Sequence, residues 1–331
     1  MKNYIALAAA TALLSACGGS SDSDAVAPAQ TGDVSFSMTD APADDLQKVQ
    51  LTVHAVSFKP AEGKAQYHEL DEPLVIDNLL DLQGTASTVI LPRTTVPAGR
   101  YNWVRLHVLG GADNTYVVDD LGGEYDLYVP GQQNGSEKVR HVQLVSGFVV
   151  PVNGEVNFTL DVDLRRAITK PENNKGYYLL RPAIRMVDNS EVGAISGTVA
   201  DSLINDASCT TDLESDSLEG NAVYLYNNFD ADTGDIFLDE LGQPADTSNP
   251  LTTANVVYNG ETDSYQYEIG FVPAGDYTVA FTCQALDDDP ETDQTLVFPA
   301  ERNISVTAEK TASADLPEII SEPVEDSVAS E

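Results

Sequence analysis

The stretch VPAGRYNWVRLHV, residues 96–108, indicates how this chain folds. Pro97 fixes its own φ, Gly99 permits a turn, and a run of aromatic and β-branched residues typical of a strand starts at Tyr101. A second copy of the motif, VPAGDYTV, begins at Val272. Each copy therefore predicts a corner from which a new strand crosses a β-sandwich.

The two copies differ in which face carries the apolar residues. In the second copy these residues share the face of Tyr277, whereas in the first they lie opposite Tyr101. A period of two then places Trp103, Arg105 and His107 on the face of Tyr101. If that face is exposed, the three side chains would form a platform for a sugar ring or an anionic polymer; if it is buried, Trp103 belongs to the core.

The rest of the chain predicts an all-β protein. Short apolar runs are broken by Gly, Pro, Asn and Asp, and only residues 76–83 fit a helix, of one or two turns. Residues 49–53 and 155–162 alternate apolar and polar side chains, and Asn153-Gly154 predicts a type I′ hairpin. We therefore expect two β-sandwich domains in tandem behind a lipidated N-terminal tether.

The N-terminus has the features of an export signal and an anchor. Lys2 precedes an apolar run, residues 4–14, that is too short to span a bilayer. LSAC, residues 14–17, resembles the lipobox of bacterial lipoproteins, which implies cleavage before Cys17 and acylation of that residue, palmitate included. Because Gly18 follows rather than Asp, the resemblance also implies transport to the cell outer membrane. An ordinary signal peptide with an incidental cysteine is the alternative.

Charge divides the chain near residue 191. Residues 1–191 carry 15 Lys and Arg against 24 Asp and Glu, and residues 192–331 carry 2 against 29, so the net charges are −9 and −27. The electrostatic field of this negative charge repels nucleic acid, so we exclude nucleic acid as a partner. The expected segments are a lipoprotein signal peptide at 1–16, a flexible tether at 17–31, a β-sandwich domain at 32–190, a second β-sandwich at 191–317 and an acidic disordered tail at 318–331.

Blocks in each half resemble known families. Five blocks, in order over residues 32–188, resemble domain-of-unknown-function family 4382 of bacterial lipoproteins. They are GDVSFSMTDAPADD, VQLTVHAVSFK, LLDLQGTASTVILPRTTVPAGRYNWVRLHV, FTLDVDLRRAI and GYYLLRPAIRMVD. That family has no established activity or site to transfer. Four blocks of the second half resemble the carboxypeptidase regulatory-like, or transthyretin-like, sandwich: AISGTVADS, NAVYLY, SYQYEIGFVPAGDYTVAF and ERNISVTAEKTASADL. This resemblance implies a non-catalytic accessory module.

Few residues point to catalysis. The four histidines, His54, His68, His107 and His141, lack zinc-ligand spacing, and the chain has neither a Gly-x-Ser-x-Gly elbow nor a phosphate-binding loop. We expect a non-enzymatic binding or structural module of the cell envelope, held in outer-membrane lipid by acylated Cys17, with a glycan or an envelope protein as partner. An envelope enzyme such as a carboxylate-dependent glycan hydrolase is the alternative, because acidic residues are abundant.

Two further features predict local structure. Cys209 and Cys283 remain after Cys17 is lipidated, and an even pair in an exported protein predicts a disulfide, with two free thiols as the alternative. NNFDADTGDIFLDE, residues 227–240, predicts a loop ordered by calcium, because hard cations need several converging oxygens; a solvated acidic loop is the alternative. Its candidate ligands are Asn228, Asp230, Asp232, Asp235 and Asp239.

Overall fold

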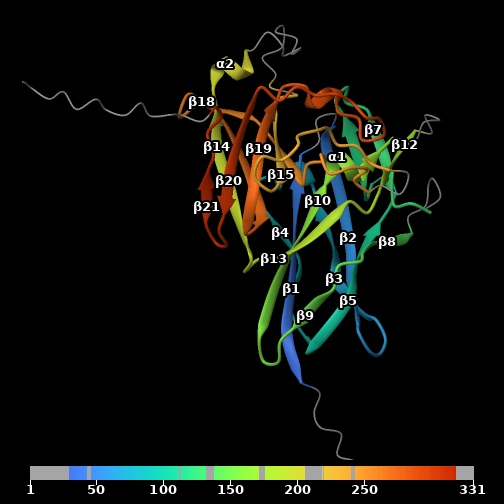
Figure 1. Cartoon of the computed structure of the whole chain (residues 1–331). Coiled ribbons are helices and arrows are strands. Elements are labelled where there is room, and N and C mark those ends of the chain that lie inside the picture. Colours follow the sequence, from blue (N-terminus) through green and yellow to red (C-terminus); the bar gives the residue numbers. More distant parts are fainter. Residues whose placement is uncertain are drawn as a thin grey trace, which may run out of the picture.

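The structure, a computed structural model, describes residues 30–42, 46–111, 113–131, 138–170, 176–205, 218, 220–239 and 243–317. Strands make up most of these residues and fall into two sandwiches, as Figure 1 shows, so the predicted all-β class is confirmed. Within the described ranges no helix is both long enough and apolar enough to cross a membrane. The expected signal peptide, tether and tail lie outside these ranges, apart from the tether's last two residues.

The first sandwich consists of two sheets. One sheet has the order β13 (Ile184–Asp188), β10 (Glu155–Asp163), β1 (Thr31–Ala41) and β4 (Thr88–Pro97). The other has the order β11 (Ile168–Thr169), β12 (Tyr177–Leu180), β7 (Glu124–Tyr128), β6 (Tyr116–Asp119), β2 (Leu46–Pro60), β5 (Gly99–Leu109) and β8 (Val139–Leu144). β3 (Gln66–Ile76) pairs with β2, and β9 (Phe148–Val150) pairs with β5.

Aromatic side chains fill the space between these two sheets. The ring of Phe36 on β1 lies 5.9 Å from that of Phe58 on β2 and 5.7 Å from those of Phe148 and Phe158. The alternation of β10 is confirmed on this side, because Phe158 and Leu160 point into the core. Rings at these separations add to the hydrophobic burial that holds the sheets together.

The second sandwich has two four-stranded sheets. One has the order β17 (Val257–Asn259), β18 (Ser264–Pro273), β14 (Val192–Val199) and β21 (Thr311–Ser313); the other has β16 (Thr252–Asn255), β15 (Ala222–Asn227), β19 (Gly275–Thr282) and β20 (Ala300–Val306). Ile195, Val223, Ile269 and Phe281 pack between them. On the outer side of β15, Tyr224 and Tyr226 are buried against segments that include Ile236 and Phe298, so β15 is buried on both faces.

The repeated motif makes the same corner in both sandwiches. The Tyr101 hydroxyl donates a hydrogen bond to the Pro97 carbonyl (2.7 Å), and Tyr277 does the same to Pro273 (2.8 Å). In each case the strand before the corner and the strand after it belong to facing sheets. The predicted sandwich corners are therefore confirmed at both positions.

A β-bulge changes the predicted faces of β5. The register between β2 and β5 slips by one residue next to Tyr101, so that Tyr101 and Val104 both point into the core. The prediction that Tyr101 shares a face with Trp103 is wrong for this reason. Trp103, Arg105 and His107 do share a face, which is the outer one, and all three are half-buried.

Two local predictions are also corrected. Asn153-Gly154 forms a turn, but it joins β9 to β10, which lie in facing sheets, so the predicted hairpin is wrong. Asn153 alone of the two has positive φ, 55°. The helix expected at 76–83 is a single 3₁₀ turn, η1 (Leu79–Asp81). The remaining helical turns, which the sequence patterns did not predict, are α1 (Leu164–Ala167), α2 (Asp201–Ile204) and η2 (Ala285–Asp287).

The tyrosine corners yield a stability prediction. Tyr101→Phe and Tyr277→Phe each remove one hydroxyl that bonds a carbonyl at a sheet-to-sheet crossing. We expect each change to lower the free energy of unfolding by about 1 kcal/mol, measured by urea denaturation. Tyr67→Phe, on an exposed strand position, is the matched control and should have little effect. Equal midpoints for all three variants would contradict the role given to the corners.

Candidate functional site

The predicted ligand residues lie on the outer face of the β3-β2-β5-β8 strands. There the Arg105 guanidinium stacks 4.1 Å from the centroid of the Trp103 ring, and its Nε donates to Gln143 Oε1 (2.8 Å). Among the described residues, none accepts a hydrogen bond from the terminal nitrogens of Arg105. Lys59 stands directly opposite Trp103 in the strand register. The face thus combines an aromatic ring with two cationic side chains.

His107 lies beside this stack. Its Nε2 is 2.8 Å from Ser57 Oγ, and its ring centroid is 4.8 Å from that of Tyr67 and 5.5 Å from that of His141. Burial, then the charges of His141 and Arg105, lower the pKa of His107 to about 4. This imidazole is therefore neutral at neutral pH and offers a hydrogen bond rather than a charge.

Three of the four histidines meet on this outer face, which the sequence patterns did not predict. His54 Nε2 lies 3.3 Å from Glu69 Oε1 at the same face, near His107 and His141, whereas His68 stacks its ring on the core ring of Phe58 (4.7 Å). In the part of the chain that the structure describes, no group of three or more His, Cys, Asp and Glu side chains is arranged to hold a metal ion.

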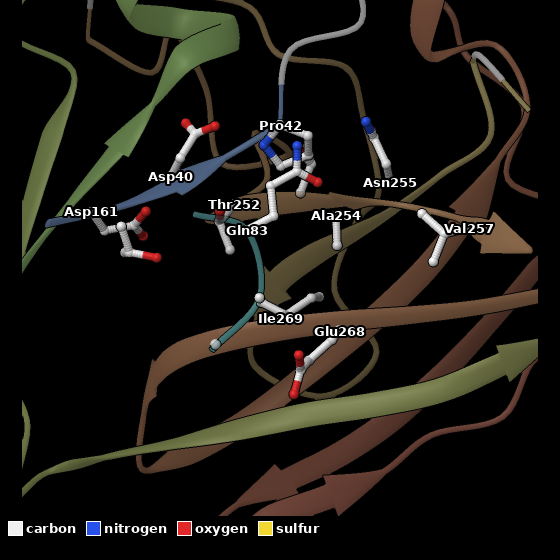
Figure 2. Close-up of a pocket in the computed structure, with 14 residues that line it drawn as sticks. Asp40, Pro42, Gln83, Asp161, Thr252, Ala254, Asn255, Val257, Glu268 and Ile269 are labelled. Carbon is white, nitrogen blue, oxygen red and sulfur yellow. The ribbon is translucent and has the colours of Figure 1, made fainter. Parts of the chain in front are cut away.

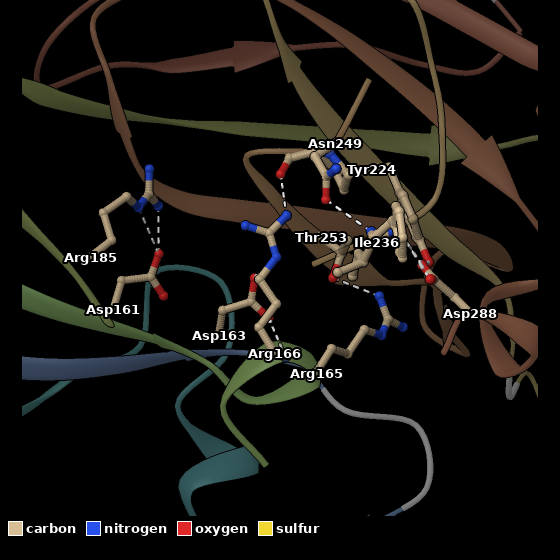
Figure 3. A network of polar contacts seen from close by, with 12 residues as sticks. Asp161, Asp163, Arg165, Arg166, Arg185, Tyr224, Ile236, Asn249, Thr253 and Asp288 are labelled. Atoms are coloured by element: carbon tan, nitrogen blue, oxygen red, sulfur yellow. Dashed lines mark hydrogen bonds and ion pairs between the residues drawn. The ribbon is translucent and has the colours of Figure 1, made fainter. Parts of the chain in front are cut away.

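A second concentration of polar groups lies where the two sandwiches meet. Helix α1 places Arg165 against the second sandwich, where its Nη1 donates to Thr253 Oγ1 (2.6 Å; Figure 3). Its Nη2 donates to Asn255 Oδ1 (3.1 Å). The neighbouring Arg166 donates through Nη2 to the carbonyl of Pro250. Two adjacent side chains of the first sandwich are thus bonded to β16 and to the segment just before it.

Three carboxylates lie close to these arginines: Asp40 and Asp161 are buried and Asp163 is half-buried. Asp161 accepts from Arg185, whose Nη2 lies 2.5 Å away, and Asp163 forms an ion pair with Arg166 at 3.2 Å (Figure 3). Asp40, at the end of β1, is 4% exposed, and neither of its carboxylate oxygens has a hydrogen-bond partner among the described residues. Burial, then the charges of Asp161 and Asp163, raise the pKa of Asp40 well above its usual value.

Two clefts open along the same junction. One, of about 200 Å³, is lined by Asp40 and by residues of both sandwiches (Figure 2). The other, of about 560 Å³, has Leu121 and Leu286 on opposite sandwiches and includes Asp288. Burial raises the pKa of Asp288 to about 6, although the Tyr224 hydroxyl, 2.5 Å from its Oδ2, opposes that shift.

The candidate calcium ligands lie along one loop but accept hydrogen bonds from different protein donors. Asp230 Oδ1 accepts from Asn303 (2.7 Å), and Asp235, which is buried, accepts from the backbone of Gln294 (2.5 Å). Asp239 Oδ1 accepts from a backbone N–H four residues later (2.9 Å). The other two candidates, Asn228 and Asp232, are exposed in the same loop. Calcium binding here stays a prediction.

The cysteine predictions also remain untested. Cys283 is buried in the second core, next to the end of β19. Cys209 and Cys17 lie outside the described residues. The Cys209–Cys283 disulfide and the acylation of Cys17 therefore stay predictions.

Comparison with known families finds a match in the first sandwich. Residues 31–182 match the family described as Domain of unknown function (DUF4382). This part of the chain is thus similar to that family. The resemblance inferred from the sequence blocks is thereby confirmed, and it adds no activity. A search of the curated proteins finds no match.

Solved structures give only distant likenesses. A leucine-rich repeat protein from Bacteroides thetaiotaomicron aligns over 87% of this chain and 26% of its own, with 13% identity and a TM-score of 0.20. A minor pilin of Streptococcus agalactiae aligns over 85% of this chain and 94% of its own, with 10% identity and a TM-score of 0.18. A fimbrial anchor protein of Porphyromonas gingivalis aligns over 80% of this chain and 83% of its own, with 8% identity and a TM-score of 0.18. The chain thus spans about a quarter of the first of these proteins. At such TM-scores the likenesses carry no argument about function.

The arginine contacts between the sandwiches predict a large loss of stability when Arg165 is replaced by alanine. Arg165→Ala removes one buried and one half-buried hydrogen bond across the junction and takes the donor from their acceptors, so we expect the free energy of unfolding to fall by about 3 kcal/mol. Arg93→Ala removes an equal charge from an exposed ion pair with Asp33 and should change stability little. Urea denaturation compares the two, and similar midpoints would contradict this assignment.

The raised pKa of Asp40 predicts that the stability of the fold depends on pH. A carboxyl whose folded pKa is raised contributes stability that is fully present below its unfolded pKa, about 3.9, and is lost as the pH rises through the folded pKa. Between pH 5 and pH 8 we therefore expect Asp40→Asn to gain melting temperature relative to the unmodified chain, with the gain increasing with pH. Asp71→Asn, at an exposed position, is the control. A constant difference across this range would rule out an ionising Asp40.

Proposed function

We propose that this protein is a non-catalytic binding module of the bacterial cell envelope that holds an anionic glycan on the outer face of β3-β2-β5-β8. The observation that supports this most directly is the stack of Arg105 on Trp103, with Lys59 opposite, in a chain of net charge −36. A cationic aromatic face in an otherwise acidic protein complements a ligand that is itself anionic.

The geometry of the stack suits a uronic acid or sulfated sugar. The guanidinium of Arg105 is fixed by Trp103 on its face and by Gln143 at Nε, so its terminal nitrogens are oriented before a ligand arrives. A planar guanidinium binds carboxylate or sulfate oxygens in pairs, and preorganisation reduces the entropy lost on binding. Neutral His107 and Tyr67 nearby add hydrogen-bonding and stacking groups for sugar rings.

A binding role also fits the carboxylates better than catalysis does. Two-carboxylate glycan hydrolysis needs one acid and one base or nucleophile facing the same bond. At the sandwich junction Asp161 and Asp163 are each held by an arginine, which leaves Asp40 without a second unpaired buried carboxylate among its described neighbours. The resemblance of the second half to the carboxypeptidase regulatory-like sandwich supports an accessory role as well.

The binding face yields a direct test with a polysaccharide probe. We expect the full chain, purified in mild detergent, to bind polygalacturonate and not neutral dextran in isothermal titration. Trp103→Ala and Arg105→Gln should each weaken binding about tenfold, or ~1.4 kcal/mol, because either change dismantles the stack. Arg93→Gln removes the same charge from the facing sheet and should leave the affinity unchanged. Equal binding of dextran, or unchanged affinity in both stack variants, would refute the proposal.

The anchoring part of the proposal rests on the lipobox resemblance. In a bacterial host we expect the unmodified chain to enter the detergent phase of a Triton X-114 partition and to fractionate with outer membranes. Cys17→Ala removes the thiol that would accept the diacylglycerol, so this variant should move to the aqueous phase. Ser15→Ala keeps a small residue in the lipobox and serves as control. Detergent-phase partitioning of Cys17→Ala would exclude the lipid anchor.

A further inference from the structure

The strand register places four side chains of the cationic face in two adjacent rows. Arg105 on β5 lies directly opposite Gln143 on β8, and two residues further along β5 His107 lies directly opposite His141. Residues directly opposite each other point to the same side of a sheet, so His141 belongs to this face. Along one strand, side chains of the same face are about 6.6 Å apart. The face therefore has a second basic position one row away from Arg105.

The side chain of His141 is accessible to a ligand. The residue is exposed, and none of the described residues forms a hydrogen bond or an ion pair with its ring nitrogens. Its ring centroid lies 5.5 Å from that of His107, whose own Nε2 is 2.8 Å from Ser57 Oγ. His107 is thus held by the protein, whereas the nitrogens of His141 are available to a ligand.

The charges nearest to His141 favour an anion beside it. Burial, then the positive charges of Arg105 and Arg140, lower the pKa of His141. A carboxylate or sulfate group bound at Arg105 offsets part of that positive charge, which favours the protonated imidazole. The proton comes from the solvent and is added to a ring nitrogen. Binding of the anion and protonation of His141 therefore strengthen each other.

Other charged groups close to this row are paired within the protein. On β2 and β3, His54 Nε2 lies 3.3 Å from Glu69 Oε1. Strand β13 of the facing sheet also approaches β8, and its Arg185 is paired with Asp161. Among the described residues no acidic side chain forms an ion pair with His141. This position is thus left for an acidic group of the ligand.

We propose that the binding face recognises an oligosaccharide with at least two acidic sugars, one bound at Arg105 and one at His141, which takes up a proton as the ligand binds. The inference rests on the anionic glycan of the proposed function and restricts it to chains of acidic sugars. A single uronic acid has one carboxylate, so it pairs with Arg105 and gains nothing from His141. A second acidic sugar adds a charge-assisted hydrogen bond to the imidazolium.

The test compares trigalacturonate with galacturonic acid in isothermal titration of the full chain. At pH 6 we expect trigalacturonate to bind about tenfold more tightly, and this ratio to shrink at pH 8, where His141 is harder to protonate. The sugar carboxylates are ionised at both pH values. Titrations in buffers of different ionisation enthalpy should show proton uptake with trigalacturonate at pH 6 and little with galacturonic acid.

Two variants of one residue separate its charge from a structural role. His141→Gln should still bind galacturonic acid but lose the preference for trigalacturonate and the proton uptake. His141→Lys carries a permanent charge, so it should keep the preference at both pH values without proton uptake. Arg93→Gln, on the facing sheet, should change neither property.

The outcomes distinguish this inference from the proposed function. Equal affinity for the two ligands, an unchanged preference in His141→Gln, or no rescue by His141→Lys would overturn the inference and leave the proposed function standing. Failure of trigalacturonate and polygalacturonate alike to bind the unmodified chain would refute both.

Discussion

The docking of helix α1 onto the second sandwich is the contact on which the junction depends. Arg165 and Arg166 carry two positive charges to a half of the chain with net charge −27, and each bonds to neutral groups there. Arg165 is itself buried, so its transfer from water would be costly without these bonds. The bonds therefore fix how the two sandwiches approach each other. Asp163, which pairs with Arg166 and caps α1, ties this helix to β10.

Close backbone packing accompanies the arginine contacts. A Cβ on Gly270 of β18 would lie 2.1 Å from the carbonyl oxygen of Gly84, so any other residue there would push the sandwiches apart. Thr85 also approaches Glu268 (3.3 Å) across the junction. Asp40, at the end of β1, lines the cleft at this junction.

Sequence patterns predicted the features that depend on neighbours along the chain. The two VPAG corners follow from local turn chemistry and a tyrosine four residues after the proline, so the patterns found both. The faces of β5 depended on a bulge against β2, and period two alone misplaced Tyr101. The histidine cluster and Asp40 were missed because their neighbours come from strands distant in sequence. A buried Asp in an acidic chain has no local signature that separates it from solvated acids.

The distribution of charge explains how a chain of net charge −36 can present a cationic aromatic face on its first sandwich. Figure 1 shows β3 and β5 in the lower part of the first sandwich, away from β14 to β21. At physiological ionic strength charges are screened over about 8 Å, so exposed acids of the second half act mainly on nearby groups. The electrostatic field at Trp103 and Arg105 is then set mainly by their own sheet, whereas the field at Asp40 is set by Asp161, Asp163 and Arg165. The two surfaces therefore differ in their charge.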